Sequence, residues 1–199
     1  MISVLWVLYM VRHGRTAHNA ARLLLGRMDV PLDEVGERQA RALSEVPALG
    51  RANRVVSSPL KRALDTAAAL GPPVAVDERW AEIDYGIYDG MELPSAAALW
   101  EGWGRDLGYR PEGGESLADL GRRVREACEA LWQEACDADV VVVSHVSPIK
   151  AAVAWALGVG DEICWRTFLD TASITVVGPG RSGKPTLRSF NETAHRPAS

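Results

Sequence analysis

Residues 7–19 read VLYMVRHGRTAHN, and this stretch decides the fold. It starts with an apolar run, typical of a strand that is buried on both faces as in a parallel sheet. The run ends abruptly in Arg12, His13 and Gly14, so a titratable side chain stands at the tip of a buried strand. Because ligands of open parallel sheets bind at the carboxyl ends of the strands, His13 is a candidate functional group.

Strand and helix patterns alternate along the rest of the chain. Strands are predicted from the N-terminus to about residue 11 and at 54–58, 73–77 and 139–145, with a terminal hairpin from 173–177 and 185–190. Helices are predicted at about 32–46, at 59–70 with Pro59 in the first turn, from Ser116 with a capping box to Asp119, and from an N-cap at Ser147 to a stop at Gly158. This alternation indicates an α/β fold around a largely parallel sheet.

The length, net charge and cysteine count limit the possible classes of protein. A chain of 199 residues fits one domain, residues 1–199, in which the irregular segment at about 83–115 is expected to be a lid-like excursion. The net charge of −4 argues against a nucleic-acid partner, and no run approaches the roughly 20 residues of a membrane span. An odd number of cysteines (Cys128, Cys136 and Cys164) without a secretory signal predicts reduced thiols and a cytoplasmic location.

Three features of the sequence resemble known catalytic or phosphate-binding motifs, but each lacks something that the chemistry of that motif requires. In DADVVV, Asp137 and Asp139 precede the strand, whereas an aspartyl nucleophile of the haloacid-dehalogenase kind follows one. The segment GRSGKP at 180–185 lacks the spacing of a phosphate loop and is predicted to be a hairpin turn. No cysteine has an arginine six residues later, which excludes the usual cysteine-based phosphatase.

Two predicted strand ends carry histidines, His13 and His145, at the same edge of the sheet. Together with Arg12 and Arg62 they would form a cationic cup, which requires an anion. Positive neighbours lower the pKa of each histidine, so one imidazole can stay neutral and nucleophilic. A helix that starts at Ser147 would point free N–H groups at the same place, which favours phosphate.

Five blocks in order resemble the histidine phosphatase superfamily: RHGRTAHN, SSPLKRALDTA, EIDYGIYDG, PEGGES and VVVSHVSPI. The resemblance implies a three-layer α/β/α sandwich with a mostly parallel central sheet, the phosphoglycerate-mutase-like fold. It also implies a nucleophile at His13, a phosphate pocket of Arg12, Arg62 and His145, a further phosphate contact from Asn19, and a proton donor at Glu82.

The chain departs from the family pattern at two positions. Val146 follows the second histidine where the family usually has glycine, and Leu25 replaces a polar residue. With Leu25 apolar, substrate contact in that segment is expected from the backbone of Gly26.

Several residues have competing interpretations. Asp84 lies two residues from Glu82 and is the alternative acid; His18 is interpreted as a surface residue and His195 as part of a poorly ordered tail. Trp100 and Trp103 either contact an apolar part of the substrate or pack the excursion onto the domain.

The most consistent function is a metal-independent phosphomonoesterase. It would hydrolyse a small phosphorylated metabolite through a phosphohistidine, with no metal or cofactor. A cofactor-dependent phosphoglycerate mutase, a non-catalytic phosphoryl-binding module and, more remotely, a metallo-hydrolase are the alternatives. A small-molecule phosphate ester is the expected partner, and a homodimer is possible.

Overall fold

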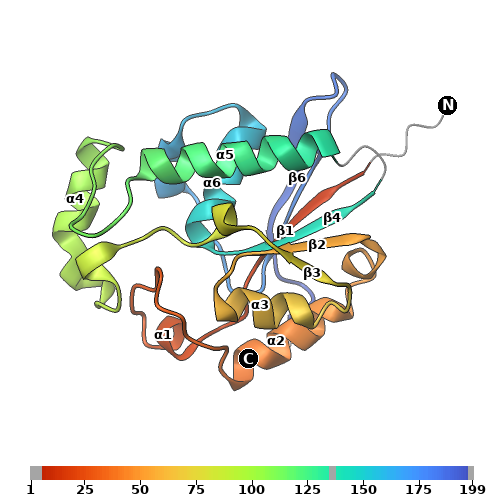
Figure 1. Ribbon diagram of the computed structural model, residues 1–199, viewed down its shortest axis with the longest axis horizontal. Helices are drawn as coiled ribbons and strands as arrows, with labels where there is room; N and C mark the ends of the chain where they lie inside the picture. The colour runs from red at the N-terminus through yellow and green to blue at the C-terminus, as the bar shows by residue number, and fades with distance from the viewer. Residues whose placement is uncertain (1–5, 135–137, 197–199) are drawn as a thin grey trace.

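A computed structural model, which describes residues 6–134 and 138–196, has a six-stranded sheet between two layers of helices (Figure 1). The strands, in sheet order, are β3 (Val74–Val76), β2 (Arg54–Ser57), β4 (Val140–Ser144), β1 (Leu8–Arg12), β5 (Ile174–Pro179) and β6 (Pro185–Glu192). Strands β3, β2, β4 and β1 run parallel, and β5 and β6 form the antiparallel terminal hairpin. The mostly parallel α/β fold and the hairpin are therefore confirmed.

Both faces of the sheet are covered by helices. Helices α2 (Glu34–Ser44) and α3 (Lys61–Ala68) lie on one face, and α5 (Leu117–Glu134) and α6 (Val146–Leu157) lie on the other (Figure 1). Strand β4 shows why its sequence is continuously apolar. Val140 and Val142 pack with residues of α5 and α6, whereas Val141 and Val143 pack with residues of α2 and α3.

The register of β1 and β4 brings two strand ends together. Arg12 pairs with Ser144 in parallel register, so His13 and His145 follow at neighbouring positions on one edge of the sheet. The backbone N–H of His13 donates to the carbonyl of Ser144 at 2.9 Å and extends the pairing by one residue. This edge, where the parallel strands end, is the place to look for a ligand site.

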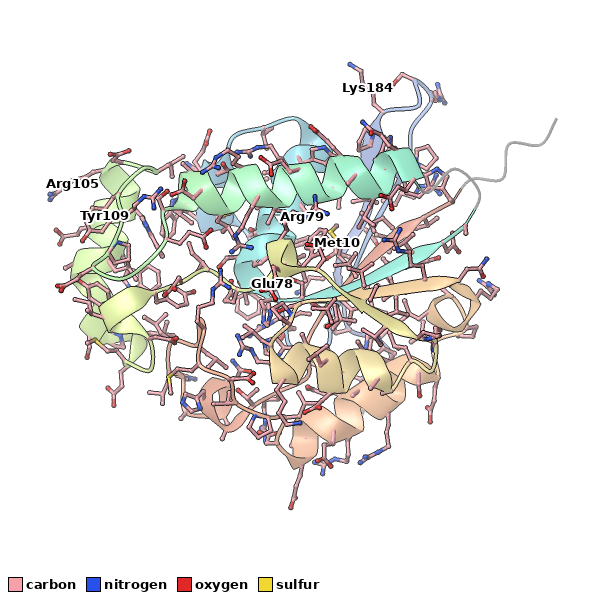
Figure 2. The ribbon with its side chains drawn as sticks, in the orientation of Figure 1. Met10, Glu78, Arg79, Arg105, Tyr109 and Lys184 are labelled. Atoms are coloured by element: carbon pink, nitrogen blue, oxygen red, sulfur yellow. The ribbon has the colours of Figure 1, made fainter. Side chains whose placement is uncertain are left out.

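A separate group of short elements lies beside this edge. Helix α4 (Ala97–Arg105) stands at the left end of the view in Figure 1. Figure 2 shows Arg105 and Tyr109 at that end, far from Lys184 at the tip of the β5–β6 hairpin. Leu99 and Trp103 of α4 are buried against the main core, so α4 is packed onto the domain. A short helix, α1 (Ala17–Ala20), follows the loop after β1.

Two predicted helix starts are wrong. Helix α3 begins at Lys61, not at Pro59, because the Ser58 hydroxyl accepts from the N–H of Leu60 at 3.3 Å and holds a local turn. Helix α6 begins at Val146 with His145 in the N-cap position, so Ser147 is not the cap.

Other predicted helix ends are confirmed. The Ser116 hydroxyl accepts from the N–H of Asp119, and Gly158 ends α6 with a left-handed φ of 66°. Cys136, Asp137 and the first part of the predicted N-terminal strand lie outside the described residues. Within the described ranges, no helix has the length and apolar character needed to cross a bilayer.

Candidate active site

His13 lies just past the end of β1 and is 3% exposed. Its Nδ1 is 2.7 Å from the carbonyl oxygen of Gly14, and its Nε2 is 3.3 Å from Nε of Arg62. A carbonyl only accepts hydrogen bonds, so Nδ1 carries the proton, and the lone pair of Nε2 accepts from Arg62. Burial, and then the charges of Arg62 and Arg12, lower the pKa of His13 well below its usual range. The imidazole is therefore neutral at pH 7, with an unprotonated Nε2.

Arg62 is fully buried on α3 beneath His13. Its Nη1 donates to the carbonyl of Met28 at 2.9 Å and its Nη2 to the carbonyl of Gly26 at 2.8 Å. The N–H of Gly26 in turn donates to Asp89 at 2.7 Å. Both backbone groups of Gly26 thus bind protein, and Gly26 does not line the cavity beside His13. Its contacts in the structure are with Arg62 and Asp89, and the expected substrate contact stays a prediction.

Arg12, the last residue of β1, lies on the other side of the nucleophile candidate and lines the cavity. Its Nη1 donates to the carbonyl of Leu169 at 2.7 Å, while its buried Nε has no partner within the described part of the chain. Burial is the main cause that lowers the pKa of Arg12, to about 10, so it remains a cation at neutral pH. Its unpaired donor can serve an anion.

His145 follows β4 and is fully buried beside His13, with ring centroids 5.0 Å apart. Its Nε2 is 2.7 Å from the Ser58 hydroxyl, and its buried Nδ1 has no partner among the residues that the structure describes. Burial, followed by the charge of Arg62, lowers the pKa of His145 well below its usual range. An unpaired polar atom in such a place is costly unless a ligand supplies the missing hydrogen bond.

Glu82 lies at the N-terminus of α6 and is 3% exposed. Its Oε1 accepts from the N–H of Ile83 at 2.8 Å, and its Oε2 accepts from the N–H of Val146 at 3.1 Å. The N–H of Ser147 also donates to this carboxylate, at 3.2 Å. The expectation that α6 offers free N–H groups to phosphate is therefore wrong for Val146 and Ser147, because the carboxylate occupies both. Glu82 itself lines the cavity.

The competing polar residues lie outside the cavity lining. Asp84 accepts from the N–H of Gly86 at 2.9 Å, which is a turn-capping role. His18 and Asp84 are both absent from the lining. The prediction of a poorly ordered tail at His195 is wrong, because its ring binds the carbonyl of Ala172 at 2.8 Å.

The cavity at this edge has a volume of about 810 Å³. Arg12, His13, Asn19 and Glu82 line one part of it. The amide oxygen of Asn19 accepts from the N–H of Thr16 at 3.1 Å, which fixes the orientation of the amide. Trp100 and Trp103 line another part and also pack against Tyr85, so their packing onto the domain is confirmed, and contact with substrate stays a prediction.

Sequence reasoning missed two supporting residues, Ser58 and Asp89. Ser58 binds the ring of His145, and Asp89 holds the loop that carries Gly26. Both lie in blocks already singled out, SSPLKRALDTA and EIDYGIYDG, but nothing local shows which distant group each one meets. Across the described ranges, no three His, Cys, Asp or Glu side chains are grouped as metal ligands would be.

Known proteins resemble this chain over most of its length. A family model described as histidine phosphatase superfamily (branch 1) matches residues 8–193. The bifunctional protein Rv2228c of Mycobacterium tuberculosis is 38% identical over 197 residues, with 94% of this chain covered. The chain spans only 54% of that relative, about half its length.

Two further similarities cover most of both chains. The probable phosphoglycerate mutase GpmB of Yersinia enterocolitica is 30% identical over 201 residues, covering 94% of this chain and 93% of the relative. The solved structure of mycobacterial glucosyl-3-phosphoglycerate phosphatase Rv2419c is 30% identical, with a TM-score of 0.82, and the match covers 95% of this chain and 100% of the other.

Proposed function

Because this chain belongs to the histidine phosphatase superfamily (branch 1), we propose that it is a metal-independent phosphomonoesterase that forms a phosphohistidine on His13. One observation carries the proposal. The unprotonated Nε2 of His13 lies among cationic side chains at the edge of the cavity, with its proton held on Nδ1 by Gly14. A neutral imidazole with a free lone pair is the form that can attack phosphorus.

In the first step, Nε2 of His13 attacks phosphorus in line with the ester oxygen. The N–P bond forms, the P–O bond to the alcohol breaks, and Glu82 donates its proton to the leaving oxygen. The placement of Glu82 in the cavity lining, with Asp84 outside it, supports this choice of acid.

The non-bridging oxygens of the phosphoryl group accept hydrogen bonds from buried donors, which neutralise their negative charge. Arg12 contributes the Nε that has no partner among the described residues, and His145 contributes Nδ1. Arg62 exchanges its hydrogen bond to His13 for a phosphate oxygen, and Asn19 reaches the group from α1. Gly26 acts indirectly, by holding Arg62 through its carbonyl. Phosphoryl transfer depends mainly on such positioning and charge neutralisation.

In the second step, the carboxylate of Glu82 takes a proton from water while the water oxygen attacks phosphorus. The N–P bond breaks and its electron pair returns to Nε2, which restores neutral His13 and releases inorganic phosphate. Glu82 regains the proton that it gave up in the first step.

A phosphoglycerate mutase is the second candidate, favoured by the similarity to a probable mutase of Yersinia enterocolitica. A mutase must keep the phosphohistidine from water until a second alcohol takes the phosphoryl group. The cavity of about 810 Å³ leaves room for water beside a small substrate, which favours hydrolysis. Phosphoglycerate interconversion, assayed beside phosphate release, separates the two.

Trapping of the phosphoenzyme tests the proposal directly. Acid-labile, alkali-stable radiolabel from a labelled phosphate ester should appear on the wild-type chain after an alkaline quench. His13→Ala should lose both this label and phosphate release. His18→Ala is the matched control, because His18 lies outside the cavity lining and should keep both. Label that survives in His13→Ala would overturn the assignment, and phosphate binding without turnover would support a non-catalytic binding module.

The proposal also covers the domain organisation, the cellular location and the partners of the chain. Residues 1–199 act as one unit in the cytoplasm, and the excursion at about 83–115 borders the cavity that takes the ester. The net charge of −4 supports a small-molecule partner over nucleic acid. Sedimentation analysis tests whether the chain forms a homodimer.

A further inference from the structure

The cavity has a second end, which differs chemically from the end at His13. Its wall there carries five aromatic side chains: Tyr85, Trp100, Trp103, Trp165 and Phe168. Leucines complete it, including Leu25, which stands where the family usually has a polar residue. Apolar and cationic side chains thus line the same cavity.

The aromatic wall joins two segments that are far apart in sequence. Trp100 and Trp103 come from α4, whereas Trp165 comes from the 3₁₀ helix at Asp161–Arg166. The ring centroid of Trp165 lies 6.1 Å from that of Trp100 and 6.5 Å from that of Trp103. Trp103 is held in place by a 2.9 Å hydrogen bond from its indole N–H to the carbonyl of Tyr109, beside α4 in Figure 2. The wall is therefore pre-formed.

Tyr85 connects this wall to the charged end. Its ring centroid is 6.4 Å from that of Trp100 and 5.9 Å from that of Trp103. Burial, and then the nearby charge of Glu82, raise the pKa of Tyr85, so its hydroxyl stays neutral. A substrate with its phosphate at His13 would therefore pass Tyr85 and extend along the aromatic rings.

Two aromatic side chains of the wall remain open to solvent. Trp165 is 45% exposed and Phe168 is 71% exposed, although both line the cavity. Exposed apolar surface at a cavity mouth is a recurrent mark of a ligand site, because covering it with an apolar group is favourable.

The cations near the wall differ in their partners. Arg15 is paired with Asp33 at 2.8 Å, and the amine of Lys150 donates to the carbonyl of Cys164 at 2.9 Å. Arg22 lines the cavity as an exposed residue. A neutral carbonyl does not cancel the charge of Lys150, so the aromatic rings, and not a shortage of cations, distinguish this end of the cavity.

We propose that the physiological ester carries a planar aromatic group on its alcohol, and that this group packs against Trp165, Phe168 and the tryptophans of α4. The inference rests on the proposed phosphatase function and adds the class of leaving group. The cavity volume of about 810 Å³ suits such an ester, since pockets that bind small-molecule ligands span roughly 300–1,000 Å³.

The test compares two esters that differ only in the ring, 3-phenylpropyl phosphate and propyl phosphate. Three methylene groups separate the ring from the ester oxygen, so both alkoxides leave with similar ease, and the ratio of their kcat/KM values reports contact with the ring. We expect a ratio of about 10 or more in favour of the aromatic ester. 3-Phosphoglycerate and glucose 6-phosphate, which have no aromatic ring, should be poorer substrates than 3-phenylpropyl phosphate.

Variants locate the contact. Trp165→Ala and Phe168→Ala should each reduce the ratio about threefold or more. Leu157→Ala is the matched control, because Leu157 is 46% exposed, much like Trp165, but lies outside the cavity; its ratio should equal that of the wild type. Phe168 is more exposed than Trp165, so Phe168→Ala should leave the fold intact and can test the contact even if Trp165→Ala unfolds the chain.

The outcomes separate the two proposals. If propyl phosphate and p-nitrophenyl phosphate are hydrolysed but the wild-type ratio is near 1, the phosphatase stands and the aromatic leaving group is refuted. A ratio that neither variant changes, or a higher kcat/KM for 3-phosphoglycerate or glucose 6-phosphate, refutes it as well. If no phosphate ester is turned over, the proposed function fails, and this inference fails with it.

Discussion

The Nε of Arg62 donates to Nε2 of His13 across 3.3 Å, from a guanidinium whose other two nitrogens are held by backbone carbonyls. After burial, the charge of Arg62 is the next cause that lowers the pKa of His13, and the same side chain also holds the ring in place. Replacing Arg62 should therefore disturb the site more than loss of one charge would suggest. Five experiments follow from this and related contacts.

Arg62→Lys should lower kcat/KM by about 100-fold, because an ammonium keeps the charge but loses the planar set of donors. Steady-state kinetics with one alkyl phosphate measures this. Arg79→Lys is the control, since Arg79 also makes a two-point contact, with Asp77, away from the cavity. Equal losses in both variants would contradict a special role for Arg62.

Glu82→Gln should separate substrates by their leaving groups. For an alkyl phosphate, kcat/KM should fall by about 100-fold or more, because an alkoxide needs a proton as it leaves. For p-nitrophenyl phosphate the loss should be much smaller, because the phenolate leaves without one. Asp84→Asn should affect neither ester, since Asp84 caps a turn outside the cavity. A uniform loss across both esters would argue against Glu82 as the acid.

Ser58→Ala should act through His145. The variant removes the 2.7 Å partner of Nε2, so the buried ring is no longer held in one tautomer and orientation. We expect a loss in kcat/KM of about 10-fold and a loss of about 1–3 kcal/mol in the free energy of unfolding. Ser57→Ala is matched in type and burial, but its hydroxyl binds a backbone carbonyl instead. Its kcat/KM should stay at the wild-type value.

The free energy of unfolding should decrease as pH is lowered from 6.5 to 5. Burial and Arg62 lower the pKa values of His13 and His145 in the folded chain, whereas the unfolded values are about 6.5. Below pH 6.5 the unfolded chain therefore binds protons that the folded chain does not. Each histidine contributes a slope of up to about 1.4 kcal/mol per pH unit, and no slope above the unfolded pKa.

Urea denaturation at several pH values measures this slope. His145→Gln should reduce the slope, since one buried imidazole is gone, while His13 and His195, whose pKa is also lowered by burial, still contribute. A free energy of unfolding that is constant from pH 6.5 to 5 would show that neither histidine resists protonation in the folded chain.

Gly36→Ala should destabilise the fold even though alanine favours helices. Gly36 lies in the first turn of α2, and a methyl group there would collide with the backbone carbonyl of Arg15. We expect a loss of about 1–3 kcal/mol, measured by thermal or urea unfolding. Gly50→Ala is the control, because nothing lies within 4 Å of the added methyl, and it should be near neutral.

The parallel sheet and the adjacency of its functional strand ends could be read from the sequence. Strand β4 is continuously apolar because both faces are covered, and a histidine directly follows each of strands β1 and β4. The apolar runs that mark buried strands are patterns within a few residues. The terminal hairpin and the end of α6 at Gly158 could also be predicted, because a turn or a left-handed φ depends on neighbouring residues.

The start of α6 illustrates where local reasoning fails. Ser147 is a good cap by residue type, but the carboxylate of Glu82, 64 residues away from Val146, supplies the hydrogen bonds instead. A side chain so remote in sequence leaves no trace in the pattern around the helix start. The same holds for Asp89, which supports Gly26 and, through it, Arg62.

The sequence by itself determined the mostly parallel sheet, the order of its motifs and the edge at which His13 and His145 meet, because the hydrophobic period is a property of short segments and helical crossovers between strands make them parallel. Only the tertiary structure decided which tautomer His13 adopts, which backbone groups Glu82 engages, and that α4 and the 3₁₀ helix with Trp165 build one aromatic wall. Those features depend on distances of a few ångströms between segments that only the packed fold brings together.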